Sequence, residues 1–255
     1  MSQRFDLSGR VVVITGAGQG IGRAFAHAFA EAGAIPVIAE LNADAGEAVA
    51  EAIRETGAQA LAVATDIGEE ESTLALAAHI QERFGRIDGL INNAGIFSTI
   101  TMRPFSEISL AEWNQVMHVN VTGVFLMTRA VAPSMKQQGF GRIINISSAA
   151  VTMGRPGYLH YIASKSALLG MSRSLAHELG GDGVTVNSLL PGATETEIDR
   201  ATVSPEQRKA MLAMRSVSRA ETPEDLVGTV LFLASPDSAF LTGQSLTVDG
   251  GLTHL

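Results

Sequence analysis

Residues 11–22 of this 255-residue chain, VVVITGAGQGIG, decide its fold. The β-branched run at 11–14 is typical of a strand that is covered on both faces, as in a parallel sheet. Glycines follow this run, and residues 21–31 then place apolar side chains at helical spacing before Gly33. A strand, a glycine-rich turn and a helix in this order predict the first βα unit of an α/β protein.

The alternation of strand and helix patterns continues along the chain. Apolar runs predict further strands at 35–39, 58–64, 89–92, 142–146, 184–190 and 245–248. Helical spacing and capping residues predict helices at 43–55, 69–84, 109–138 and 161–179, and shorter helices that begin at 204 and 222. Because no linker or repeat interrupts this order, we predict a single domain over 1–255. We expect a doubly wound parallel sheet of about seven strands with helices on both faces.

Composition and charge exclude several classes of protein. Hydrophobic residues make up 46% of the chain and charged residues 17%, which is a globular composition with ample core material. The net charge of −8 argues against a nucleic-acid partner, because binding to phosphates needs a basic surface. No stretch approaches the roughly 20 apolar residues that span a bilayer, and the N-terminus lacks the apolar core of a signal peptide. We therefore predict a cytoplasmic protein without a membrane or nucleic-acid partner.

Residue types that bind metals or form disulfides are absent or scattered. The chain has no cysteine, which excludes disulfides and thiol chemistry and fits a reducing compartment. None of the six histidines stands at a metal-ligand spacing. We therefore predict no metal site.

The glycine-rich turn has the composition of a phosphate-binding loop. Its pattern is TGxxxGxG over residues 15–22, so the strict GxGxxG fingerprint of dinucleotide-binding proteins is not present. Glycines let the backbone approach a pyrophosphate, whose charge meets the helix N-terminus. A flexible turn is the alternative, but the position between a strand and a helix favours cofactor binding. The predicted cofactor residues here are Gly16, Gln19, Gly20, Ile21 and Gly22.

Glu40 ends the second predicted strand and indicates which dinucleotide binds. A carboxylate at this position accepts hydrogen bonds from the ribose hydroxyls of adenosine and repels a 2′-phosphate. No basic residue stands at Gln19, Leu41 or Asn42, where a phosphate would need one. We therefore predict NAD as the cofactor and NADP as less favoured. A solvated charge at a strand end is the alternative interpretation of Glu40.

Two further strand ends carry small or polar residues. Asp66 and Ile67 follow the third strand and are predicted to hold the adenine, although Asp66 alone is also typical of a helix cap. Asn93, Ala94 and Gly95 follow the fourth strand, where small residues let the backbone approach a cofactor. Ligands of doubly wound sheets lie beyond the C-terminal ends of the strands, so we expect these residues to meet the glycine loop there.

Tyr161 and Lys165 are four positions apart, so a helix places both side chains on one face. Lowering the pKa of a phenol by about three units takes about 4 kcal/mol. A cation about 4 Å away supplies about 4 kcal/mol at an effective dielectric constant of about 20. The pair therefore predicts a proton donor and acceptor that works near neutral pH. A solvent-exposed i, i+4 pair is the alternative.

Together these motifs resemble those of the short-chain dehydrogenase/reductase family, in its branch of about this length. The resemblance covers residues 7–251 and rests on the glycine loop, Asp66, residues 92–95, Asn120, Ser148, Tyr161, Lys165, Asn187 and the run PGATET at 191–196. The family implies a Rossmann-type fold and nicotinamide-dependent oxidoreduction between a secondary alcohol and a ketone. It also implies a homotetramer.

The resemblance implies a catalytic function for individual residues of this chain. Tyr161 would be the general acid or base, and Lys165 would be its electrostatic partner and hold the nicotinamide ribose. Ser148 would bind the substrate oxygen, and the family's spacing to the tyrosine selects it over the neighbouring Ser147. Asn120 would support a water that links Lys165 to solvent. Further cofactor contacts are implied for Pro191, Gly192, Thr194 and Thr196.

The substrate is predicted less sharply than the reaction. Tyr158 has no cation four positions later, and we assign it to the substrate side of the site. Residues 194–219 interrupt the alternation and predict a substrate loop or lid, with simple packing of a short helix as the alternative. The apolar residues of these segments favour a medium-sized apolar or aromatic alcohol or ketone: Phe97, Met102, Met153, Met211, Leu212 and Met214.

Three functions fit the sequence. The first is an NAD-dependent secondary alcohol dehydrogenase or ketoreductase. The second is a 3-oxoacyl-carrier-protein reductase, which would prefer NADPH and a basic docking surface, so Glu40 and the acidic charge count against it. The third is a non-catalytic NAD-binding regulator, which the complete set of catalytic residues disfavours.

Overall fold

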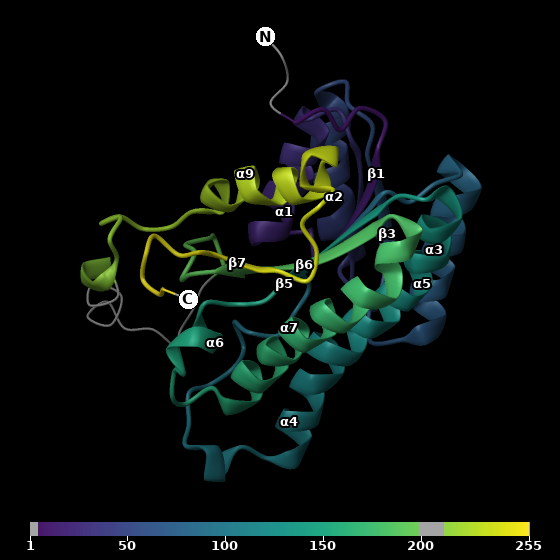
Figure 1. The fold of residues 1–255 in the computed structure, drawn as a ribbon. Helices are drawn as coiled ribbons and strands as arrows, with labels where there is room; N and C mark the ends of the chain where they lie inside the picture. The colour runs from purple at the N-terminus through teal and green to yellow at the C-terminus, as the bar shows by residue number, and fades with distance from the viewer. Residues whose placement is uncertain (1–4, 199–211, 255) are drawn as a thin grey trace.

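The computed structural model of the chain describes residues 5–198 and 212–254. All seven of its strands belong to one parallel sheet with the order β3-β2-β1-β4-β5-β6-β7. Figure 1 shows this sheet with helices on both of its faces. The strands are β1 (Val11–Thr15), β2 (Ile35–Glu40), β3 (Leu61–Ala64), β4 (Gly89–Asn92), β5 (Gly141–Ile146), β6 (Val184–Pro191) and β7 (Ser245–Val248). The helices are α1 (Gly20–Glu31), α2 (Ala43–Glu55), α3 (Glu70–Phe84), α4 (Leu110–Met117), α5 (Gly123–Gln138), α6 (Ala150–Met153), α7 (Leu159–Leu179) and α9 (Pro223–Ala234).

This architecture confirms the predicted doubly wound parallel sheet, and most element boundaries agree within two residues. The prediction for β3 was too long, since this strand begins at Leu61, where its pairing with Val37 of β2 starts. Helix α6 was not predicted. The helix expected to begin at residue 204 lies outside the described residues.

The helix predicted over 109–138 changes its hydrogen bonding in the middle. Ser109 caps α4 as expected, with its hydroxyl accepting a hydrogen bond from the Glu112 N–H at 3.1 Å. A π-helical segment, His118–Thr122, then joins α4 to α5. Single-turn π segments often occur at functional sites, and this one contains Asn120.

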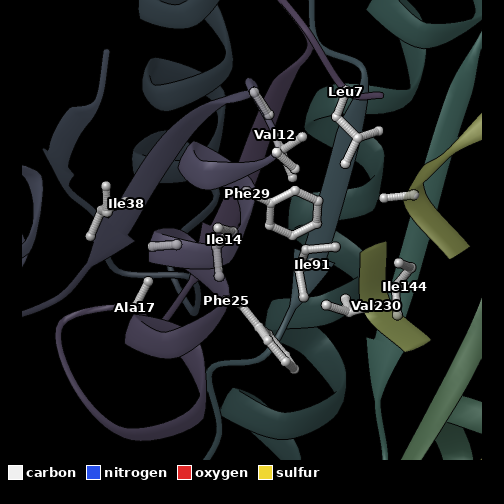
Figure 2. Close-up of a cluster of buried hydrophobic side chains, with 14 of the residues drawn as sticks. Leu7, Val12, Ile14, Ala17, Phe25, Phe29, Ile38, Ile91, Ile144 and Val230 are labelled. Carbon is white, nitrogen blue, oxygen red and sulfur yellow. The ribbon is translucent and has the colours of Figure 1, made fainter. Parts of the chain in front are cut away.

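Alternate side chains of β1 face two separate hydrophobic cores. Val12 and Ile14 pack in a core with α1, α2 and α9, where Phe25 and Phe29 of α1 are completely buried (Figure 2). Val11 packs on the other face of the sheet, in a core with α3, α5 and α7. Because helices cover both faces, β1 is a continuous apolar run rather than an alternating one.

The order of the sheet determines where a ligand can bind. From β1 the chain first builds outward to β2 and β3, and then returns to the other side of β1 with β4. The connections from β1 to β2 and from β4 to β5 therefore run toward opposite edges of the sheet, which leaves a crevice at the C-terminal ends of β1 and β4. Among the described residues, no helix is long and apolar enough to cross a membrane.

Candidate active site

A cleft of about 680 Å³ lies at the C-terminal ends of the strands. It brings together residues from every segment that the sequence singled out. The predicted site residues that line the cleft are Gly16, Gln19, Ile21, Glu40, Asp66, Ile67, Asn93, Ala94, Gly95, Ser148, Tyr158, Tyr161, Lys165, Pro191, Gly192, Thr194 and Thr196. Gly20, Gly22 and Asn120 do not line it.

The glycine loop packs closely against the end of β4. Gly16 has a positive φ of 63°, and a methyl group on it would lie 2.8 Å from the Ala94 Cα, so a larger residue does not fit there. The Asn93 side-chain amide donates hydrogen bonds to the carbonyls of Thr15 and Gly16, each at 3.0 Å. Gly22 is buried against this contact, since a methyl group on it would collide with the Gly16 carbonyl oxygen and lie 2.6 Å from Asn93 Nδ2. The loop is thus held rigidly with its backbone facing the cleft.

Gly20 contacts the segment after β6 rather than the cleft. Its N–H donates to Glu197 Oε1 at 2.8 Å, and the same oxygen lies 3.0 Å from the Arg23 guanidinium. The hydrogen bond from Gly20 and the nearby Arg23 lower the pKa of the Glu197 carboxyl. A carboxylate therefore already uses one N–H at the N-terminus of α1, and a phosphate in the cleft would use the neighbouring N–H groups.

The Glu40 carboxylate stands at the edge of the cleft beside the glycine loop. Its two oxygens accept hydrogen bonds from Gly18 N at 2.9 Å and from Asn42 N at 3.1 Å. These bonds fix the orientation of the carboxylate. Asp66 lies nearby at the end of β3, where its Oδ1 accepts a hydrogen bond from Gly68 N at 2.8 Å.

Lys165 is a buried cation at the centre of the site. Only 5% of its surface is exposed, and burial lowers the pKa of its ammonium to about 8. Its Nζ donates to the Ile146 carbonyl at 2.8 Å, which is its hydrogen-bond partner within the described residues. An ammonium has three N–H donors, so two remain for a ligand in the cleft. Tyr161, one helical turn earlier on α7, is also buried and lines the cleft.

Asn120 lies behind the cleft with a completely buried side chain. Its Oδ1 accepts a hydrogen bond from Ile96 N at 2.7 Å, and its Nδ2 donates to Ser164 Oγ at 3.1 Å. A methyl group on Gly95 would lie 3.1 Å from Asn120 Oδ1 and 3.3 Å from Lys165 Nζ, so Gly95 separates these two groups. The side chain of Asn120 thus fixes the loop after β4 against α7.

The adjacent serines differ in their environments. Ser147 is buried, and its hydroxyl donates to the Lys165 carbonyl at 2.8 Å. Ser148 lines the cleft, and its hydroxyl accepts a hydrogen bond from Ala150 N at 3.2 Å. This bond leaves the Ser148 hydroxyl hydrogen free to point at a substrate oxygen.

An aromatic cluster forms one wall beside Tyr161. The ring centroid of Phe97 lies 4.6 Å from that of Tyr161 and 5.9 Å from that of Tyr158. Met102 packs against this cluster but does not line the cleft. The Tyr158 hydroxyl is buried without a hydrogen-bond partner in the described part of the chain.

Sequence reasoning missed several polar residues of the cleft. Gln115, Arg155 and Arg215 line it without having been predicted, and so does His118, which the sequence allowed near the site although a structural role was favoured. They come from α4, the π segment and two loops, so no common spacing along the chain links them. Across the described ranges, no group of three or more histidine, aspartate or glutamate side chains could hold a metal ion.

Comparison with known proteins identifies the family. Residues 16–253 match the family model described as enoyl-(acyl carrier protein) reductase. The chain is 36% identical over 248 residues to the 3-oxoacyl-[acyl-carrier-protein] reductase of Vibrio harveyi, which covers 97% of this chain and 98% of the relative. It is 36% identical over 250 residues to the 7alpha-hydroxysteroid dehydrogenase of Escherichia coli, covering 98% and 96%.

A solved structure from Beutenbergia cavernae is similar over nearly its whole length. It carries the provisional name NAD(P) dependent gluconate 5-dehydrogenase and contains NADP at low occupancy. The TM-score is 0.90 at 39% sequence identity, and the match covers 97% of this chain and 98% of that one. On these matches and its fold, the chain belongs to the short-chain dehydrogenase/reductase family and is an oxidoreductase that acts on CH–OH groups with NAD(P) as acceptor.

Proposed function

We propose that this chain is an NAD(H)-dependent oxidoreductase that interconverts a secondary alcohol and a ketone. The nicotinamide ring of the bound dinucleotide would donate or accept the hydride. Tyr161 gives or takes the proton at the substrate oxygen, and the Ser148 hydroxyl holds that oxygen. Lys165 stabilises the tyrosinate through its charge and binds the nicotinamide ribose with its two remaining N–H donors.

The position of Glu40 carries the choice of NAD over NADP. Its carboxylate is held by two backbone N–H groups beside the glycine loop, so it cannot move away without losing both hydrogen bonds. A 2′-phosphate on the adenosine ribose would meet this negative charge. The relative from Beutenbergia cavernae contains NADP, so the preference has to be measured on this chain.

We propose a medium-sized apolar or aromatic substrate. Five apolar or aromatic residues line the cleft: Phe97, Met153, Tyr158, Leu212 and Leu252. The proposed substrate loop, 194–219, is described only at its two ends, and Met211 lies outside the described residues. Met214 is 65% exposed and does not line the cleft.

Reduction of 3-oxoacyl groups on a carrier protein is the second candidate, favoured by the 36% identity to the Vibrio harveyi enzyme. It differs from the first in its expected cofactor, NADPH, and in its need for a basic docking surface. The net charge of −8 disfavours such a surface. A non-catalytic NAD-binding regulator would bind NADH but turn over no substrate.

A spectrophotometric screen of ketones, alcohols and 3-oxoacyl thioesters with all four nicotinamide dinucleotides separates these functions. The decisive variant is Glu40→Gln, which removes the charge but keeps an oxygen that accepts one of the two backbone hydrogen bonds. We expect the ratio of kcat/KM for NAD(H) over NADP(H) to fall at least about tenfold. Two like charges about 4 Å apart repel by about 4 kcal/mol at an effective dielectric constant of about 20, which exceeds the roughly 1.4 kcal/mol of a tenfold change.

The control is Glu47→Gln, which neutralises an exposed glutamate of α2 that pairs with Arg54. An unchanged ratio in Glu40→Gln, or an equal fall in both variants, would show that Glu40 is not the selector.

We further propose a homotetramer in the cytoplasm. Leu110 on α4 is 73% exposed and Phe125 on α5 is 48% exposed, so apolar surface is available on these helices for contact between subunits. Sedimentation velocity of the purified protein measures the assembly.

A further inference from the structure

A buried ion pair lies beside the cleft and takes no part in the chemistry proposed above. The Arg215 guanidinium lies 3.3 Å from Glu221 Oε2, and the two side chains are only 2% and 5% exposed. Burial raises the pKa of the Glu221 carboxyl, because its charged form loses contact with water. Replacing such a pair by apolar side chains is often neutral or stabilising, so its presence calls for another explanation.

The pair contacts three successive residues of the turn after β6. Glu221 Oε1 accepts hydrogen bonds from Gly192 N at 3.1 Å and from the Thr194 hydroxyl at 2.7 Å. Arg215 donates to the carbonyl of Ala193 at 3.1 Å. One ion pair therefore fixes the N–H, the carbonyl and the side chain of a turn that lines the cleft.

Gly192 also packs closely against the side chains of the ion pair. A methyl group on Gly192 would lie 2.5 Å from Glu221 Oε2 and 3.0 Å from the Arg215 guanidinium. The main chain of Glu221 also pairs with that of Thr194, and its carbonyl accepts a hydrogen bond from Glu195 N at 2.7 Å. Residues 192–194, Arg215 and Glu221 thus form one rigid unit, although more than 20 positions along the chain separate the turn from the ion pair.

This unit lies at one end of the cleft, far along the sheet from Glu40. The turn follows β6, whereas Glu40 ends β2, and three strands separate β2 from β6 in the sheet order. A dinucleotide with its adenosine near Glu40 would extend along the cleft, so its nicotinamide end would lie toward the turn after β6, in the cleft that Lys165 and Tyr161 also line.

We propose that Arg215 and Glu221 are positioning residues that hold the turn 192–194 in the shape that binds the nicotinamide. This inference rests on the proposed function, which places a nicotinamide dinucleotide in the cleft. Its consequence is specific: losing the ion pair weakens binding of the nicotinamide end and leaves the adenosine end unchanged.

ADP-ribose tests this consequence because it has the adenosine, pyrophosphate and second ribose of NADH but no nicotinamide. The variants are Glu221→Gln, which leaves Arg215 unpaired, and Arg215→Lys, which keeps the charge but loses the planar fork. Binding of NADH is measured by its own fluorescence and binding of ADP-ribose by calorimetry, at a temperature where circular dichroism shows each variant folded.

We expect the Kd of NADH to rise about tenfold in both variants, since hydrogen bonds to charged groups are lost, while the Kd of ADP-ribose changes less than about twofold. The matched control is Arg219→Met. It breaks the exposed ion pair of Arg219 with Asp225, whose nearest atoms are 2.6 Å apart, and leaves the turn untouched. Both affinities should stay at the wild-type value in this control.

An equal loss of affinity for NADH and for ADP-ribose would indicate a general structural effect and overturn the proposal. Unchanged affinities for both ligands would overturn it as well.

The double variant Arg215→Gln/Glu221→Gln, which leaves no lone buried charge, should recover part of the NADH affinity. If wild-type protein binds NADPH rather than NADH, the same ratio is measured with NADPH and 2′-phospho-ADP-ribose, so a wrong cofactor preference does not affect this test. If the wild type binds neither dinucleotide, the proposed function and this inference both fail.

Discussion

Lys165→Met should inactivate the protein and make it more stable at neutral pH. The Lys165 ammonium is buried, and burial lowers its pKa from 10.5 to about 8. The folded state therefore disfavours the charge that this side chain carries at pH 7. Methionine has a similar length and no charge, so it occupies the same space without this penalty.

The size of the effect follows from the shift in pKa. A pKa of about 8 in the folded state and 10.5 in the unfolded state corresponds to about 3 kcal/mol of destabilisation at pH 7. The variant also loses the hydrogen bond to the Ile146 carbonyl, which costs about 1 kcal/mol. We expect a net gain of about 2 kcal/mol in the free energy of unfolding at pH 7, or about 4–8 °C in Tm.

The gain should depend on pH in a defined direction. Between pH 8 and 10.5 the unfolded wild type binds more protons than the folded wild type, so its stability rises with pH across this window. Near pH 10.5 the folded protein holds Lys165 in its neutral form, so the cost of burying its charge has largely gone. The stability difference between variant and wild type should therefore be largest below pH 8 and shrink as pH rises toward 10.5.

Urea unfolding at pH 7, 8, 9 and 10 measures this difference, with the fluorescence of the single tryptophan, Trp113, as the signal. Protein concentration is kept constant because assembly would contribute to stability. Lys136→Met is the control, since Lys136 is 48% exposed in an ion pair with Asp182 and should show no such window. A Lys165→Met protein that is less stable than wild type at pH 7, or a difference that does not change with pH, would refute this reasoning.

Two further predictions concern the proton-transfer residues. Tyr161→Phe should lower kcat at least about 100-fold while the Kd of NADH stays within about twofold, because the hydroxyl acts on the substrate oxygen; near-normal turnover would contradict the mechanism. Ser148→Ala should lower kcat with little change in Tm. Ser147→Ala should keep turnover but lose about 1–3 kcal/mol of stability in urea, because the Lys165 carbonyl loses its buried partner. The reverse pattern in the two serine variants would exchange their assigned functions.

The fold could be predicted from the sequence because the apolar pattern of each strand matches the way in which the strand packs in the sheet. The apolar run of β1 is continuous since Val11 and Val13 face one core and Val12 and Ile14 face the other. The sequence alone therefore indicates that both faces of this strand are covered. The strand β3 was predicted too long because Ala58 and Ala60 continue the apolar pattern of the strand, whereas residues 58–60 have no partner on β2.

The cofactor end of the site was also accessible from the sequence, since its residues follow directly after strands. Glu40 and Asp66 end or follow neighbouring strands, and parallel strands bring their C-terminal ends to one edge. The π segment with Asn120 was not accessible. One inserted residue shifts the apolar spacing by a single position, which lies within the ordinary variation of helical patterns, so only the hydrogen bonds reveal the change.

The ion pair of Arg215 and Glu221 marks the limit of this kind of prediction. The two residues are six positions apart in an irregular segment, where no helical or strand period relates them. Most arginines and glutamates are exposed, so composition predicts a solvated surface here. Their burial follows from the turn at Gly192, which has no side chain and leaves room for a carboxylate at its N–H. A residue without a side chain thus creates a site for charged residues more than 20 positions later, and only the folded chain brings the two together.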